Sequence, residues 1–364
     1  MSSAHALDAA DLRARVQSVV DRVLIEQGAI LREVSPDLDP MVDSLTGLLA
    51  GGKRLRPAFC YWGWRGAGGS SHDAGNADAD DAALLAAASL EFLQACALIH
   101  DDVMDGSDTR RGLPAAHRRF EQAHRDAGWL GSSASFGIGA AILLGDLCLS
   151  WADEILMLSG FDAPSLARAK PVYDVMRTEL MAGQYLDLLE QARGGGSVER
   201  ALRVVRYKSA KYTIERPLHL GAALAGADQH LIDAYTAYGL PLGEAFQLRD
   251  DILGVFGDPA QTGKPAGDDL REGKRTVLIA TALERATDAQ ASDLRAGLGD
   301  PGLDASMVDR LRDIISATGA LAHTEDLIDT MLDRSIVALD TAEIDPEAKA
   351  ILIELAFAAT RRAA

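Results

Sequence analysis

Three aspartates, Asp101, Asp102 and Asp105, follow directly after a long apolar run at 82–99. The run is rich in Ala and Leu and contains no Pro, which predicts a mostly buried helix. Asp101 and Asp105 are four residues apart, so on a helix they share one face. Unpaired carboxylates at the end of a buried helix are costly, and oxygen-rich sites of this kind suit Mg²⁺. The alternative interpretation is a solvated acidic helix end.

A second acidic pair, Asp250 and Asp251, ends another apolar helical run, and this repetition favours the metal site. Basic residues follow each group: Arg110 and Arg111 after the first, Lys264 and Lys274 after the second. In a metal–diphosphate site the metal contacts the carboxylates, while Arg and Lys contact the outer phosphate oxygens. The sequence therefore predicts that a diphosphate is bound through Mg²⁺.

The composition indicates an all-α protein. Of 364 residues, 48% are hydrophobic but only 5% are aromatic. Abundant Ala and Leu favour helices packed on helices. Helical periodicity without strand-like alternation predicts a loose tail at 1–7 and one large antiparallel helix bundle over 8–364. The expected helices are 8–34, a short one ending at 50, one between the turn at 51–57 and a loop at 66–81, then 82–105, 115–127, 136–159, 164–192, 198–226, 228–256, and several between 274 and 362.

The net charge of −18 argues against nucleic acid and against an anionic membrane surface as general partners. Cys60, Cys96 and Cys148 lie in apolar surroundings without metal-ligand spacing, which indicates reduced core residues of a cytoplasmic protein. No uninterrupted apolar span with suitable flanks and no signal peptide are found, so stable membrane insertion is not expected.

Further motifs stand in a fixed order between Gly51 and Thr276. They are Gly51-Gly-Lys-Arg-Leu-Arg-Pro57, the aspartates 101–105 with Arg110-Arg-Gly112, Gly145-Asp146, Gly183-Gln184 with Asp187, Lys208-Ser-Ala, Phe246-Gln247 with Asp250-Asp251, and Thr262-Gly-Lys264. Each motif is weak alone, but together they are specific. The chain resembles the trans-isoprenyl (polyprenyl) diphosphate synthases, in particular the bacterial geranylgeranyl diphosphate synthases.

The resemblance implies an isoprenoid synthase bundle around a central cavity, usually as a homodimer. It also implies a reaction in which three Mg²⁺ bridge the two acidic helix ends to the diphosphate of dimethylallyl, geranyl or farnesyl diphosphate. Loss of that diphosphate gives an allylic cation, which isopentenyl diphosphate attacks head-to-tail before a proton is lost. Such catalysis is mainly electrostatic and positional, in a cavity that excludes water.

The resemblance also assigns roles residue by residue. The metal ligands are Asp101 and Asp105, supported by Asp102, and Asp250, supported by Asp251. The residues expected at the allylic diphosphate are Arg110, Gln184, Lys208, Ser209, Gln247 and Lys264. Those expected at isopentenyl diphosphate are Lys53, Arg56, Gln94 and Arg111. Two positions depart from the family pattern: Gln94 replaces a common His, and Gly254 replaces the third Asp of the second motif, for which Asp258 could compensate.

Product length is expected to depend on the wall below the first acidic motif. In the family, a bulky aromatic four or five residues before the first Asp stops growth at C15, but here Cys96 and Ala97 are small. Phe92 and Leu93 lie one turn further along, with Phe92 as the expected floor, which predicts geranylgeranyl diphosphate (C20). The alternatives are that Phe92 packs against another helix and that the product is farnesyl diphosphate or a chain of C25 and above.

Two other functional classes share some of these features. A non-catalytic modulating subunit typically loses one acidic motif, whereas this chain keeps both. A class I terpene cyclase lacks the isopentenyl-binding segment, whereas this chain has Gly51–Pro57 and Arg111. Both observations favour the chain-elongating prenyltransferase.

Overall fold

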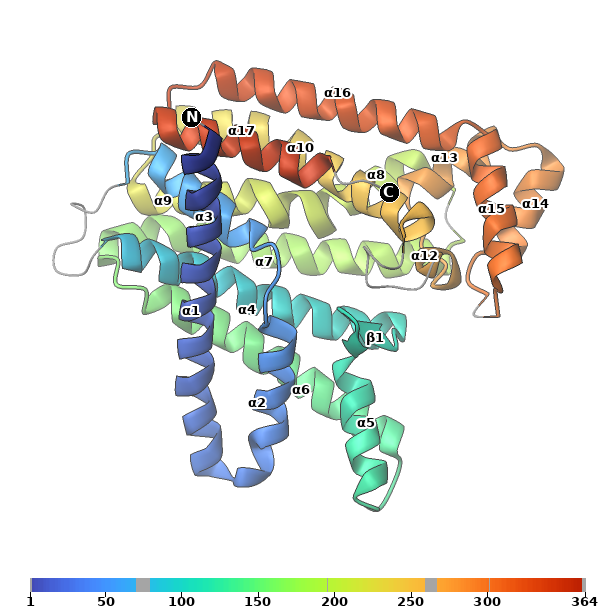
Figure 1. Cartoon of the computed structure of the whole chain (residues 1–364), viewed down its shortest axis with the longest axis horizontal. Coiled ribbons are helices and arrows are strands. Elements are labelled where there is room, and N and C mark those ends of the chain that lie inside the picture. The colour runs from blue at the N-terminus through green and yellow to red at the C-terminus, as the bar shows by residue number, and fades with distance from the viewer. Residues whose placement is uncertain (1, 70–78, 195, 259–266, 301, 362–364) are drawn as a thin grey trace. The chain divides into compact units, whose positions relative to one another are not determined.

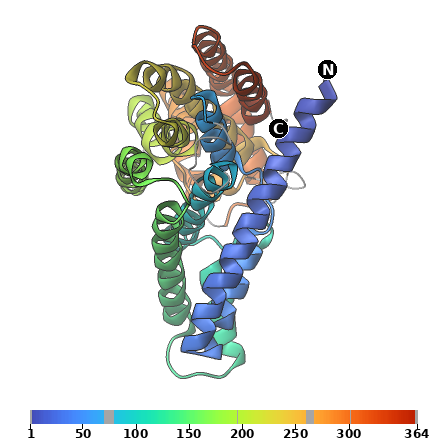
Figure 2. The ribbon, with the colours of Figure 1, turned by 90° about the vertical axis from the view of Figure 1, so that its left-hand side faces the viewer.

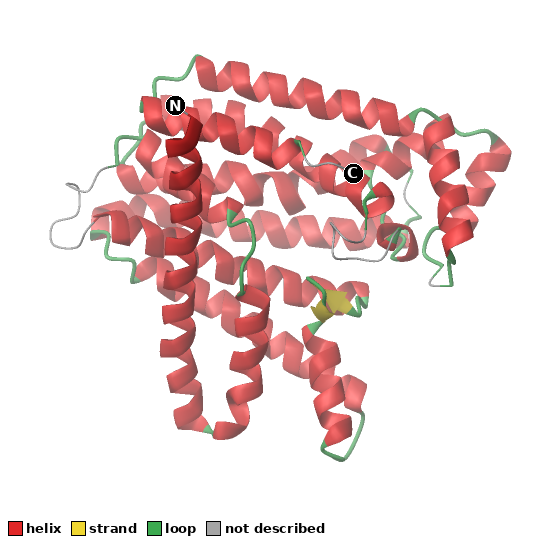
Figure 3. Cartoon of the chain, viewed as in Figure 1, coloured by secondary structure: helices red, strands yellow, loops and turns green. Residues whose placement is uncertain are grey.

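The protein is almost entirely helical (Figure 3). A computed structural model describes residues 2–69, 79–194, 196–258, 267–300 and 302–361. Within these residues the only strands are β1 (Thr109–Arg110) and β2 (Leu113–Pro114), which pair antiparallel as a minute hairpin. The all-α fold class predicted from the sequence is confirmed.

The chain divides into two compact units (Figure 1): Met1–Tyr61 with Gly69–Leu166, and Trp62–Gly68 with Ala167–Ala364. The first unit contains α1 (Ser2–Val34), the 3₁₀ helix η1 (Pro36–Leu38), α2 (Asp39–Leu49), most of α3 (Leu55–Gly66), α4 (Ala79–Asp105), α5 (Ala116–Asp126) and α6 (Ser133–Met157). The second contains most of α7 (Ala163–Ala192), α8 (Val198–Val204), η2 (Val205–Glu215), α9 (Arg216–Ala225), α10 (Gln229–Phe256), α12 (Asp268–Arg271), α13 (Val277–Arg285), α14 (Asp288–Gly297), α15 (Ala305–Ala317), α16 (Ala320–Asp340) and α17 (Pro346–Thr360).

Helix α4 is the central element of the first unit. It packs most extensively against α6 and also contacts α1, α2 and α5. The helices α1 and α2 lie side by side as a hairpin (Figure 2). Phe92 of α4 is fully buried, and its ring meets the ring of Trp151 of α6 edge-on, with centroids 6.4 Å apart. The packing around α4 therefore fixes the position of the aspartates at its end.

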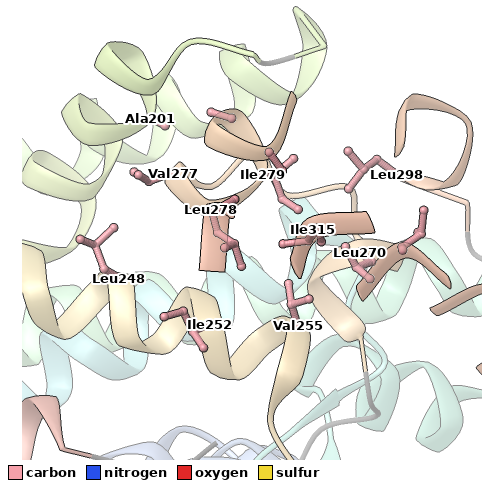
Figure 4. Close-up of a cluster of buried hydrophobic side chains, with 14 of the residues drawn as sticks. Ala201, Leu248, Ile252, Val255, Leu270, Val277, Leu278, Ile279, Leu298 and Ile315 are labelled. Atoms are coloured by element: carbon pink, nitrogen blue, oxygen red, sulfur yellow. The ribbon is translucent and has the colours of Figure 1, made fainter. Parts of the chain in front are cut away.

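Helix α10 has the same role in the second unit, where it packs against α16 and η2. The side chain of Asp228 caps its first turn by accepting a hydrogen bond from the Leu231 N–H at 3.0 Å. Toward its other end, α10 contributes to a buried apolar cluster (Figure 4). The residues labelled there are Ala201, Leu248, Ile252, Val255, Leu270, Val277, Leu278, Ile279, Leu298 and Ile315. This cluster holds the helix segment that carries Asp250 and Asp251.

The helix predicted over 198–226 contains an unexpected π-helical segment, η2. In a π-helix each backbone N–H bonds the carbonyl five residues back, which widens the turn. Two glycines let neighbouring helices approach it closely. A Cβ at Gly183 of α7 would lie 2.3 Å from the backbone nitrogen of Lys208. A Cβ at Gly243 of α10 would lie 2.6 Å from the Ala210 Cα. The segment is therefore enclosed by backbone on two sides.

Several element boundaries differ from the prediction. Helix α1 begins at Ser2, so residues 2–7, expected as a tail, are helical; this stretch contains Ala and Leu and no helix breaker. Helix α4 begins at Ala79 rather than at residue 82. The stretch 257–273, for which no helix is predicted, contains the short helix α12, and the hairpin β1–β2 is too short to give an alternating pattern.

Two helices, α4 and α6, are long and apolar enough to cross a membrane by length and composition alone. The most apolar window of α4 is 78% buried inside the structure, as expected of a core helix, whereas that of α6 is only 28% buried. The exposed large apolar side chains of α6 are Phe136, Ile138, Ile142, Leu143 and Met157. Exposed apolar side chains of this kind are found at protein interaction surfaces when they form a large contiguous patch.

Candidate active site

At the first acidic helix end, an arginine from the hairpin pairs with two of the aspartates. Asp102 is 2% exposed, and its Oδ1 accepts a hydrogen bond from Arg110 Nε at 2.8 Å. Arg110 Nη2 also contacts Asp102 and lies 3.4 Å from Asp101 Oδ2. A buried carboxylate is costly unless it is paired. Arg110 thus stabilises the charge of Asp102 and lies beside Asp101.

The hairpin turn returns Arg110 to the helix end. The helix stops at Gly106, which is left-handed at φ +67°. Between the two strands stand Arg111 and Gly112, at φ +54° and +75°. Two successive positive φ values suit a tight hairpin, but at an arginine this conformation costs about 1 kcal/mol or more. Strained residues of this kind gather at functional sites, which fits the role expected for Arg111.

The segment Gly51–Pro57 approaches Arg111. A Cβ at Gly52 would lie 3.6 Å from both terminal nitrogens of the Arg111 guanidinium, and Arg111 Nη1 donates to the Leu48 carbonyl at 2.7 Å. Although Arg111 is exposed as a whole residue, desolvation by surrounding protein atoms lowers its pKa; Arg54, Arg56 and Arg110 lower it further and Glu91 opposes them. The structure therefore brings the two predicted basic segments together, with Lys53 exposed and Arg56 half-buried.

One residue of this cluster was missed by the sequence analysis. Arg54 is 4% exposed and forms an ion pair with Glu91 of α4, which is also 4% exposed. It donates further hydrogen bonds to the Leu49 carbonyl and to Gln17 Oε1. The available signal was Glu91 itself, because an ionisable residue inside an apolar run must find a buried partner. Gln94 stands three residues after Glu91 and is half-buried.

The second acidic helix end has a different electrostatic environment. Asp251 is 5% exposed, and its Oδ1 accepts a hydrogen bond from Gln247 Nε2 at 2.8 Å. Its Oδ2 is buried and has no hydrogen-bond partner among the described residues. Burial raises the pKa of Asp251 to about 8; the charges of Asp269 and Asp250 also raise it, while Gln247 and Lys274 oppose them. Asp251 is therefore a poorly compensated carboxyl in the absence of a cation.

Gly254, the departure from the family motif, makes room for a different carboxylate. A Cβ at Gly254 would lie 1.9 Å from Asp269 Oδ2, so the Asp269 side chain fills the space beside this glycine. Lys274 Nζ lies 3.5 Å from Asp269 Oδ1 and 2.6 Å from Glu272 Oε2. The acidic residue that approaches Gly254 in the structure is thus Asp269, while Asp258 is exposed.

The remaining residues expected at the allylic diphosphate lie mostly on η2 and α7. Lys208 Nζ donates to Asp187 Oδ2 at 2.6 Å, so two of the quoted motifs meet. Lys208, Ser209 and Gln184 are all half-buried. Lys264 lies outside the described residues.

The residues expected to set product length lie along α4. Phe92, Leu93 and Cys96 are buried and Ala97 is half-buried. Cys96 Sγ is 3.7 Å from His100 Nδ1, and the Phe92 ring packs on Trp151 of α6. That packing was the alternative interpretation of Phe92, so its role as a floor stays a prediction.

The donors at both helix ends fit magnesium. Among the residues that the structure describes, no group of three or more His, Cys, Asp or Glu is arranged to enclose a metal. Mg²⁺ is usually held by one or two carboxylates and completes its shell with water and substrate phosphates, so a closed protein cage is not required. The buried Asp251 Oδ2, which lacks a hydrogen-bond partner, also fits a cation.

Comparisons with known proteins agree with these features. The polyprenyl synthetase family model matches residues 39–315. The crystal structure of a Corynebacterium glutamicum geranylgeranyl pyrophosphate synthase, complexed with isoprenyl diphosphate and magnesium, is 43% identical with a TM-score of 0.92, covering 97% of this chain and 99% of that one. A geranylfarnesyl diphosphate synthase of Aeropyrum pernix is 33% identical over 85% of this chain and 90% of its own length. A geranylgeranyl diphosphate synthase of Mycobacterium tuberculosis is 33% identical over 84% and 79%.

The names of the relatives agree on the reaction class but not on the product. They include geranylgeranyl, geranylfarnesyl, farnesyl and octaprenyl diphosphate synthases. The family predicted from the motifs is confirmed. The chain belongs to the polyprenyl synthetase family and is a prenyltransferase of the trans-prenyl diphosphate synthase type.

Proposed function

We propose that this enzyme condenses isopentenyl diphosphate with allylic diphosphates in a Mg²⁺-dependent reaction whose main product is geranylgeranyl diphosphate. The observation that carries the proposal is the cluster at the end of α4, where Asp101 and Asp102 meet Arg110 and where Arg111 meets Gly52. Carboxylates for a metal and arginines for diphosphates stand side by side there. The Corynebacterium relative, crystallised with isoprenyl diphosphate and magnesium, supports the same chemistry.

The proposed site residues have separate roles. Asp101, Asp105 and Asp250 hold magnesium, with three ions expected per site, and Asp102 and Asp251 support them. When bound, Mg²⁺ stabilises the negative charge that develops on the departing diphosphate. The allylic diphosphate is bound by Arg110, Gln184, Lys208, Ser209, Gln247 and Lys264. Isopentenyl diphosphate is bound by Lys53, Arg56, Gln94 and Arg111. These side chains orient the two substrates, and the catalytic gain comes from positioning and charge.

The C20 product is proposed because the positions nearest the first aspartate are small. Cys96 and Ala97 have small side chains, and Phe92, one turn further along, is large and buried against Trp151. The name of the Corynebacterium relative favours the same length. A farnesyl product or a chain of C25 and above is the second candidate, because relatives of similar identity carry names of both kinds.

We also propose a cytoplasmic homodimer in which residues 8–364 form one domain. The exposed apolar side chains of α6 offer the dimer surface, and the family match at 39–315 draws on both compact units. All three cysteines are free and buried, which fits a reducing compartment. Analytical ultracentrifugation of wild type and of Leu143→Asp tests the dimer. The variant is expected to shift toward monomer, and an unchanged mass would contradict an interface at α6.

One assay tests the reaction itself. The purified protein is incubated with Mg²⁺, radiolabelled isopentenyl diphosphate and each of dimethylallyl, geranyl and farnesyl diphosphate, and the products are sized. Label should enter a C20 chain from all three primers, and EDTA should abolish incorporation. Products formed without isopentenyl diphosphate would indicate a terpene cyclase. Incorporation that requires an added partner synthase would indicate a modulating subunit.

A further inference from the structure

We propose that the buried ion pair between Arg54 and Glu91 is a positioning device for the isopentenyl diphosphate site. The inference rests on the proposed function, which assigns Lys53 and Arg56 to that substrate. Arg54 itself is not a ligand in this proposal. It acts through its two neighbours in the chain by fixing the backbone that carries them.

The burial pattern separates Arg54 from the residues beside it. Lys53 is exposed and Arg56 is half-buried, whereas the Arg54 side chain is only 2% exposed. Its guanidinium is engaged by Glu91, the Leu49 carbonyl and Gln17 Oε1, all of them protein groups. A guanidinium held in this way cannot also reach a diphosphate. Glu91 also neutralises its charge, so its function has to be structural and local.

Arg54 and the three groups that hold it form an anchor, which also contacts the start of the turn at Gly51. Gln17 Oε1, which accepts from Arg54, accepts a second hydrogen bond from the Gly51 N–H at 3.0 Å. Gln17 therefore connects α1 to both Gly51 and Arg54, and Lys53 lies between these two fixed points. The backbone of Lys53 is therefore fixed on both sides, although the Lys53 side chain is exposed.

The backbone of Arg54 shows that the anchor determines the conformation. Arg54 has φ +51°, in the left-handed region that non-glycine residues rarely adopt. Gly51 and Gly52, earlier in the same turn, have φ +73° and +113° at positions where glycine removes that cost. A strained residue persists only where surrounding contacts over-determine it. Once the side chain is released, we expect Arg54 to relax to negative φ and to displace Lys53 and Arg56.

Helix α4 links the anchor to the rest of the proposed site. Glu91 and Gln94 are three residues apart on this helix and so lie on one face, one turn apart. Gln94 is an assigned isopentenyl ligand, and α4 also ends in the metal-binding aspartates. The ion pair therefore ties the loop ligands to the helix that carries the other groups, which sets their mutual spacing.

The test is the double variant R54M/E91M, because replacing a buried ion pair by apolar residues of similar size often preserves stability. We expect the KM for isopentenyl diphosphate to rise about 10-fold or more, since small displacements of binding groups have effects of this size. The KM for geranyl diphosphate should stay within about twofold of wild type, and thermal unfolding should show an intact fold. Calorimetric titration with isopentenyl diphosphate alone should show the same loss of affinity. E91Q, which keeps the side-chain volume, should raise the KM for isopentenyl diphosphate by a smaller factor. This variant provides the test if the double variant does not fold.

A matched control is available in the second unit. Glu190 is buried and accepts hydrogen bonds from Arg200 Nε at 2.8 and 2.9 Å, outside both proposed diphosphate sites. E190Q should lower the unfolding temperature and leave both KM values unchanged. Wild-type affinity for isopentenyl diphosphate in R54M/E91M, or an equal rise in both KM values, would overturn the positioning role alone. A wild-type protein that fails to bind isopentenyl diphosphate would instead overturn the proposed function and this inference with it.

Discussion

The two acidic helix ends carry the same Asp-Asp pair but differ in how their charge is compensated. At the end of α4, Asp102 is paired with Arg110, and Asp101 lies beside the same guanidinium. At the end of α10, Asp251 has one hydrogen bond from Gln247 and a buried oxygen without a partner, close to the charges of Asp250 and Asp269. At the first end, Arg110 offsets the charge of Asp102 and part of the charge of Asp101 before any metal binds. At the second end, burial and the neighbouring carboxylates favour the protonated form of Asp251, and a bound cation would favour its charged form.

The largest effect is expected from removing a metal ligand at either end. Asp101→Ala and Asp250→Ala should each lower kcat by at least about 10²–10³-fold, the scale found for one preorganised electrostatic contact in a transition state. Circular dichroism should show an unchanged helical fold. Steady-state kinetics with geranyl and isopentenyl diphosphate gives the comparison, and near-normal turnover in either variant would remove that residue from the metal assignment.

Stability in EDTA should distinguish the two ends. Asp102→Asn breaks a buried ion pair and should cost about 3 kcal/mol of unfolding free energy. Asp251→Asn removes a poorly compensated carboxyl of nearly the same size, and its stability should stay within about 1 kcal/mol of wild type or exceed it. Urea unfolding of the two variants at pH 7.5 measures the difference. Equal losses would mean that the ends do not differ as described.

A dependence on pH should follow from the same contrast. The folded-state pKa of Asp251 is raised from 3.8 to about 8, so the folded chain holds this proton more tightly than the unfolded chain. The resulting stability is fully present below about pH 4 and is lost as pH rises toward 8. The unfolding free energy of wild type minus that of Asp251→Asn, measured in EDTA, should therefore fall between pH 5 and 8. A flat difference would place Asp251 at an ordinary pKa.

The smallest energetic change concerns only the first end, where α4 also supplies the proposed wall for the product. Ala97→Phe or Cys96→Phe should shift the main product from C20 to C15, because an added aromatic ring overfills the space. Phe92→Ala should lengthen it, although this change also removes the contact with Trp151 and should lower stability. Product sizing by reversed-phase chromatography tests both. If both phenylalanine variants fold and keep the wild-type length, this wall does not measure the chain.

The sequence alone predicted those structural features whose signal lies in neighbouring residues. Apolar periodicity predicted α10 as 228–256, and the structure has Gln229–Phe256. Two features depended on contacts between distant residues and could not be read from local patterns. The π-helical form of η2 is accompanied by the close approach of Gly183 and Gly243, and the burial of Arg54 depends on Glu91, 37 residues away. The placement of the Asp269 side chain in the space beside Gly254 likewise depends on a contact between distant residues.

The π-helical segment η2 has a consequence for how this chain can change over evolution. An α-helix turns by about 100° per residue, so the number of residues in η2 sets the rotational phase between α8 and α9. Lys208 and Lys211 both reach α7 from within this segment, at Asp187 and Glu179. Deleting a single residue between Val205 and Glu215 would rotate one flank against the other and direct at least one of these lysines away from its partner. Substitutions are compatible with this stretch as long as its length is kept, so η2 constrains insertions and deletions more strongly than amino-acid identity.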